Sequence, residues 1–216
     1  MPIKKTVFAS LFLILFSKPF YAQTKLFFKT DIGLSSMRYR PAIPIGGRFG
    51  YGIGAEGLFK INTRDEMLKY WSFNPSLTFT KTAYTIYVAN AANSNIVAKY
   101  LRLDMPLMHD FYTDNPSHEL LIGAGLFTAL PLGGHFTDQS TRYKMRYGNT
   151  SASNRGGSDI GMVFKLSMTH FANTDIRFSL QYNYGLTNLV PKYYNPNNIR
   201  IRSRNIYISF AFPIDL

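Results

Sequence analysis

Four histidines are the side chains best suited to acid–base chemistry in this chain of 216 residues, which contains no cysteine. A hydrolase would need a serine, a histidine and an acid that converge on one place. Only His135 has such candidates nearby in the sequence, namely Ser140, Asp138 and Asp159, and random loop composition explains that set equally well. The other histidines fall near predicted turns or on an apolar face: His109, His118 and His170. No two histidines have metal-ligand spacing, so we expect no catalytic, metal or cofactor site.

A second set of reactive side chains consists of charges that alternate with apolar residues, so that all of them fall on the polar face of predicted strands. One interpretation is a polar conduit or small-solute site. The other is a network of ion pairs that fills a narrow barrel, where charges must be paired to be tolerated. Narrow barrels usually lack an open pore, which favours the network, and the pairs Glu56–Arg102 or Asp104–Arg48 are expected. The charges are Lys29, Asp31, Arg48, Glu56, Lys60, Arg102, Asp104, Lys165 and Arg177.

Two segments between predicted strands, 131–158 and 186–202, interleave basic and aromatic residues. Such mixtures can bind nucleic acid through stacking and phosphate contacts. Beside an outer membrane, the expected anion is instead the phosphate of lipopolysaccharide, and a merely solvated surface is the open alternative. The candidate surface contacts are Arg142, Tyr143, Lys144, Arg146, Lys192, Tyr193 and Tyr194.

The elements that must position these residues are revealed by apolar–polar alternation at a period of two, which is typical of strands. It recurs over 25–37, 48–61, 70–82, 99–112, 119–130, 159–171, 175–185 and 203–213. Most of these segments reach the roughly 9–11 residues of a tilted membrane-spanning strand, and short connections alternate with longer ones. The sequence therefore predicts an all-β, eight-stranded antiparallel transmembrane β-barrel of the up-and-down type, with both ends in the periplasm.

Alternation alone does not say which face points inward, because a soluble barrel would alternate too. Two features favour the membrane. The polar face carries mostly small residues, which suit a narrow lumen, and only 17% of the chain is charged. Aromatic residues near the strand ends would form girdles at the two membrane interfaces; these are Tyr39, Tyr70, Trp71, Tyr84, Tyr100, Phe111, Tyr112 and Phe171.

The N-terminal residues predict export. Lys4 and Lys5 precede an apolar run from Val7 to Phe16, which is too short to span a bilayer and is followed by a plausible cleavage point after Ala22. We therefore expect a signal peptide at 1–22 and an outer-membrane barrel domain at 23–216. Cleavage would remove three lysines and no acid, which lowers the net charge from +12 to +9.

Several stretches resemble the PorT-type outer-membrane β-barrel family of Bacteroidota. Tyr100–Met108 is similar to the family's "YLxIPLLxK" strand, Leu121–Gly125 to the next strand, Tyr182–Asn188 to its "YxYGLxN" motif, and Asn205–Phe212 to its last strand. Asp110 departs from the pattern, since the family tends to have lysine and aromatic residues there. The resemblance implies an eight-stranded barrel and, through the founding member, a link to protein secretion and maturation.

The function expected from these observations is that of a non-enzymatic outer-membrane barrel, an envelope scaffold or docking protein with basic aromatic loops. An accessory of a secretion system, a narrow pore and a lipid-modifying enzyme are the alternatives. The expected partners are outer-membrane lipid or lipopolysaccharide and other envelope or secretion proteins, and nucleic acid is not expected.

Overall fold

The structure is a computed structural model that describes residues 21–40, 45–61, 67–87, 94–111, 119–138, 141–148, 153, 157–169, 176–190 and 200–214. The strands are β1 (Tyr21–Arg40), β2 (Ile45–Ile61), β3 (Trp71–Phe73), β4 (Ser76–Ile86), β5 (Ser94–Asp110), β6 (Glu119–Asp138), β7 (Thr141–Lys144), β8 (Asp159–Thr169), β9 (Arg177–Gly185) and β10 (Arg200–Ile214). Within these ranges, no helix has the length and apolar character needed to cross a bilayer.

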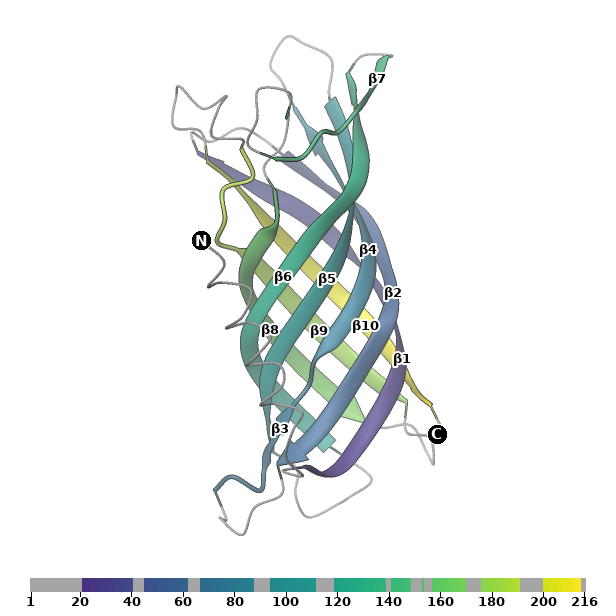
Figure 1. The fold of residues 1–216 in the computed structure, drawn as a ribbon, viewed down its shortest axis with the longest axis vertical. Coiled ribbons are helices and arrows are strands. Elements are labelled where there is room, and N and C mark those ends of the chain that lie inside the picture. The colour runs from purple at the N-terminus through teal and green to yellow at the C-terminus, as the bar shows by residue number, and fades with distance from the viewer. Residues whose placement is uncertain are drawn as a thin grey trace, which may run out of the picture.

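Eight of the strands close into a ring. Each pairs antiparallel with its neighbours in the order β5-β4-β2-β1-β10-β9-β8-β6, and β6 pairs back with β5. The closing pair of first and last strands is long, because β1 and β10 remain in register from Leu26–Ile214 to Arg40–Arg200. Figure 1 shows the tilted strands wrapping around one axis, with β3 and β7 as short additions at opposite ends. The prediction of an eight-stranded, up-and-down antiparallel barrel is confirmed.

The two ends of the barrel differ. We call the end where β10 finishes the turn end, and the end that carries β7 the loop end (Figure 1). At the loop end, β6 continues to Asp138 and forms a hairpin with β7, so the prediction that all of 131–158 is loop is wrong. At the turn end, the strand predicted at 70–82 divides into β3 and β4 at Pro75, which has no N–H to donate to a neighbouring strand.

Side chains on the barrel wall alternate strictly between a buried and an exposed face. On β8 the odd-numbered residues are buried and the even-numbered residues are exposed over the whole strand. The exposed face is apolar on all eight strands, and we call this surface the apolar belt. One of its residues on each strand, 37 to 58% exposed, is Ile32, Ile53, Phe79, Leu107, Leu126, Phe164, Leu180 and Phe210.

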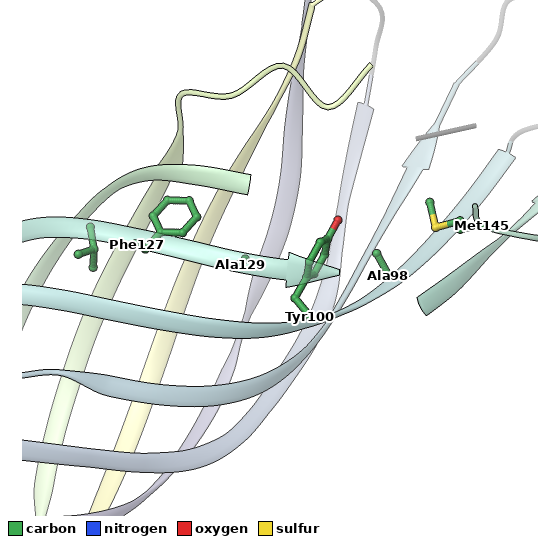
Figure 2. Close-up of a cluster of buried hydrophobic side chains, with 6 residues drawn as sticks. Ala98, Tyr100, Phe127, Ala129 and Met145 are labelled. Atoms are coloured by element: carbon green, nitrogen blue, oxygen red, sulfur yellow. The ribbon is translucent and has the colours of Figure 1, made fainter. Parts of the chain in front are cut away.

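The interior is layered. Near the turn end, a buried apolar layer consists of Phe27, Leu58, Met108, Leu121 and Ala211. Toward the loop end, a second layer consists of Ala98, Tyr100, Phe127, Ala129, Met145 and Val163 (Figure 2). Polar and charged side chains fill the space between the two layers, so the barrel has an ionic centre with apolar ends.

Two aromatic residues predicted at a membrane interface are inside instead. Tyr84 is 1% exposed and Tyr100 is 6% exposed. Tyr100 lies two residues from Arg102 on β5 and therefore shares its inward face. Tyr70 and Trp71 are half-buried near the turn end and Phe111 is exposed there, whereas Tyr112, Phe171 and the side chain of Tyr39 lie outside the described residues. Residues 1–20 also lie outside them, so the signal peptide stays a prediction.

Candidate functional site

The centre of the barrel is a network of seven buried charges. Their side chains come from β1, β2, β5, β8 and β9 and meet in the interior because each lies at an inward position of its strand. All are at most 3% exposed, and they are Lys29, Asp31, Glu56, Arg102, Asp104, Lys165 and Arg177. Four cations face three carboxylates, which leaves the network with one positive charge in excess.

Glu56 is the centre of one half of the network. Its carboxylate lies 2.5 Å from the Lys165 ammonium, 3.3 Å from the Arg177 guanidinium and 3.7 Å from the Lys29 ammonium. The amide of Asn74 also donates to Glu56 at 3.1 Å and accepts a bond from Lys165 at 2.7 Å. One carboxylate therefore compensates cations from three strands.

Arg102 is the centre of the other half. It donates to Asp31 at 2.6 Å and to Asp104 at 2.9 Å, and its guanidinium lies 4.4 Å from the ring centre of Tyr207. Lys29, 3.6 Å from Asp31, connects the two halves. The predicted pair Glu56–Arg102 is wrong, because both residues are fully engaged with other partners.

Arg48 and Lys60, the other two charges predicted in the lumen, lie at its ends. Arg48 is exposed at the loop end, where it donates to Asn95 at 2.9 Å, so the predicted pair Asp104–Arg48 is also wrong. The β2–β4 register shifts between Arg48 and Tyr51, which breaks the alternation that suggested an inward position. Lys60 pairs with Glu119 at 2.5 Å near the turn end and is 33% exposed.

Neutral side chains complete the charge network. Gln181 accepts a bond from Lys29 at 3.2 Å and donates to Asn183 at 2.8 Å. Asn183 in turn donates to Asp104 at 3.1 Å. Dense mutual compensation of this kind is what a buried ionic filling requires. The arrangement therefore fits the filling interpretation better than that of a solute site.

The candidate hydrolase set is not assembled by the residues that the structure describes. His135 Nδ1 lies 2.9 Å from Arg142 Nη2 at the loop-end hairpin. Asp159 is buried on β8 and accepts hydrogen bonds from Ser203 and from Thr187. Ser140 and the side chain of Asp138 lie outside the described residues. Within the described ranges, no cluster of three metal-ligating side chains occurs either.

The predicted surface contacts lie partly on the β6–β7 hairpin. Tyr143 stacks on Phe136 with ring centres 4.9 Å apart, and Arg142, Lys144 and Arg146 are exposed. Tyr147 anchors the base of this hairpin by donating to the Gly133 carbonyl at 3.0 Å, and burial raises its pKa to about 12. Lys192, Tyr193 and Tyr194 lie outside the described residues.

A further basic cluster was missed by the sequence analysis. Arg38, Tyr184, Arg200 and Arg202 line an open hollow of about 320 Å³ on the outer face of the barrel, near the loop end. Arg200 and Arg202 had been assigned to a loop, although β10 begins at Arg200. The period-two spacing of Arg200, Arg202 and Arg204 is the signal that could have revealed a strand with one basic face.

No protein-family model matches the sequence, and no curated protein sequence matches it. Solved structures of outer-membrane β-barrel proteins resemble the fold. Neisserial surface protein A shares 12% identity over 89% of this chain and 99% of its own, with a TM-score of 0.47. OprG of Pseudomonas aeruginosa shares 10% identity over 91% and 98%, with a TM-score of 0.48.

Ail, the attachment invasion locus protein of Yersinia pestis, solved in complex with the heparin analogue sucrose octasulfate, gives a TM-score of 0.42. It shares 10% identity over 88% of this chain and 99% of its own. At these levels of similarity, function has to be inferred from this chain's own residues.

Proposed function

We propose that the chain is a non-enzymatic outer-membrane β-barrel protein that acts as an envelope scaffold or docking protein. The observation that carries the proposal is the inverted distribution of side chains. Lys29, Glu56 and Arg177 are fully buried, whereas large apolar residues are exposed on every strand of the ring. Contiguous apolar surface beyond a few hundred Å² marks a membrane or protein contact, and a belt around a whole barrel fits lipid.

The closed ring supports a membrane location for a second reason. Hydrocarbon offers no hydrogen-bonding partners, so a sheet can cross it only when both edge strands are paired. The β1–β10 and β5–β6 pairings provide this closure. In the usual orientation of such barrels, the turn end faces the periplasm and the loop end faces outward.

The layered interior supports a scaffold rather than a pore. The apolar layer around Phe27 and Leu121 and the layer around Tyr100 and Phe127 lie on either side of the ionic network. The accessible chemistry is then at the loop end, where the β6–β7 hairpin presents basic and aromatic side chains. We propose that this hairpin contacts lipopolysaccharide or another envelope component.

The membrane proposal is tested by folding residues 23–216 with lipid vesicles and, separately, in buffer without detergent. We expect protease-protected β-structure only with vesicles. A stable, dispersed monomer in plain buffer would contradict it. The docking role is tested in cells by shortening the β6–β7 hairpin and comparing the proteins that co-purify from intact envelopes. Unchanged partners and an unchanged envelope phenotype would contradict a docking role for the hairpin.

A secretion accessory is the second candidate, and it rests on the resemblance of Tyr100–Met108 and Tyr182–Asn188 to the PorT-type family. If it is right, deletion of the gene reduces the amount of exported protein at the cell surface, and the full-length gene restores it. Normal export in the deletion strain would rule it out.

A further inference from the structure

The basic cluster on the outer face of β1, β9 and β10 begins where the apolar belt ends. Going toward the loop end, Leu34 and Ile206 are register partners, 47% and 49% exposed. Two pairs further along the same face, Arg38 and Arg202 are partners. At roughly 3.3 Å per residue, these arginines lie about one lipid headgroup beyond the last apolar pair.

The pairing within this cluster is costly in the absence of an anion. Arg38 and Arg202 lie directly opposite each other on antiparallel strands, and like charges in that position destabilise a sheet. Arg200 and Arg204 add charge on either side of Arg202 at the same period-two spacing. No carboxylate among the described residues forms an ion pair with these four arginines. A bound anion would remove the repulsion.

The cluster also has the shape and donors of an anion site. Arg204 is register partner of Tyr184, its guanidinium lies 5.6 Å from the tyrosine ring centre, and its Nε is buried without a hydrogen-bond partner. The Tyr184 hydroxyl lies within hydrogen-bonding reach of Arg38, Arg202 and Arg204. Guanidinium groups bind phosphate through two parallel hydrogen bonds, which an ammonium group cannot do.

We propose that Arg38, Arg200, Arg202, Arg204 and Tyr184 form a binding site for a phosphate group of an outer-leaflet glycolipid. The inference rests on the proposed membrane location. It names a site on the barrel wall that is separate from the β6–β7 hairpin. The position at the edge of the belt favours a lipid over a soluble anion, because the acyl chains of the same molecule would lie against Leu34 and Ile206.

The test uses the protein folded in detergent micelles and titrated with bis-phosphorylated lipid A, with its dephosphorylated form and with inorganic phosphate. We expect binding of the phosphorylated lipid only. In the double variant Arg38→Gln/Arg202→Gln, we expect affinity at least about tenfold weaker, since hydrogen bonds to charged groups contribute about 1.5–3 kcal/mol each. Equal binding of the dephosphorylated lipid, or binding of inorganic phosphate with the same affinity, would overturn the proposal.

The matched control is Lys81→Gln/Lys99→Gln. These lysines are also direct register partners, on β4 and β5, and they also follow apolar outward residues, but they do not line the hollow. We expect this variant to bind within about twofold of the wild type, since exposed charges contribute little without a built site. An equal loss in both double variants would mean diffuse attraction and would overturn the site.

Insertion into vesicles is measured on the same samples. A protein that inserts but does not distinguish the phosphorylated lipid removes this inference and leaves the membrane proposal intact. A protein that does not insert removes both.

Discussion

The Lys165 ammonium lies 2.5 Å from a carboxylate oxygen of Glu56, although the two residues are 109 positions apart in the chain. They belong to β8 and β2, which are not neighbours in the ring. The ion pair therefore crosses the interior, and together with Arg177 and Lys29 it ties opposite walls of the barrel to one carboxylate.

Loss of that carboxylate should be severe. Glu56→Gln leaves three buried cations without their main counter-charge, and uncompensated buried charge costs about 3–5 kcal/mol. We expect the free energy of unfolding to fall by that amount in urea titrations of the folded protein in micelles. Lys60→Gln is the control, because its pair with Glu119 is partly exposed and should contribute at most about 1 kcal/mol. Equal effects of the two variants would show that the centre is not the stabilising element.

The apolar belt should reject charge in a way that depends on depth. Ile208 is 44% exposed near the middle of the outward face of β10, and Ile214 is 42% exposed at its turn end. We expect Ile208→Arg to destabilise the folded barrel in vesicles by about 2–4 kcal/mol, and Ile214→Arg by about 0–1 kcal/mol. Urea unfolding from vesicles measures both. Indifference at both positions would mean that the belt does not face hydrocarbon.

Gly125 should be irreplaceable at the β5–β6 pairing. A Cβ at this position would lie 2.1 Å from the Met105 carbonyl oxygen and 2.6 Å from the Pro106 Cα, both of them backbone atoms. We expect Gly125→Ala to cost about 1–3 kcal/mol, since overpacking shifts the backbone, and to lower the folded yield. Gly157→Ala is the control, because no atom lies within 4 Å of its added Cβ. A normal yield for Gly125→Ala would contradict the observed strand spacing.

The filled interior predicts electrical silence. Purified wild-type protein in a planar bilayer should give no stable unitary conductance, because the layers around Phe127 and Leu121 and the charges between them occupy the lumen. A porin in the same chamber serves as the positive control. Discrete and reproducible current steps from the wild-type protein would contradict a filled barrel and would favour the narrow-pore alternative.

The sequence was sufficient to predict the fold, because alternation at a period of two repeats over eight segments and the β8 residues follow it without exception. The same periodicity assigned Lys29, Glu56 and Arg177 to the interior. It failed at Arg48, where a shift in register interrupts the alternation.

The partners of each buried charge were beyond the reach of the pattern. Which inward residues meet depends on the tilt of the strands and on the register between them, and neither can be read from one strand at a time. Glu56 therefore pairs with Lys165 across the barrel, whereas Arg102 pairs with Asp104, two residues away on its own strand. The arginine cluster was missed for a related reason, because β10 extends further toward the loop end than its apolar residues indicate.

The convergence of five strands on a single ionic centre has a consequence for assembly. Glu56 reaches its cations only when β1, β2, β8 and β9 are all in place, so a partly zipped wall would hold bare charges against oily surroundings. Intermediates with a few strands inserted are thereby penalised, and the polypeptide is driven to enter the bilayer as one concerted unit whose final seam, between its first and last strands, acts as a latch.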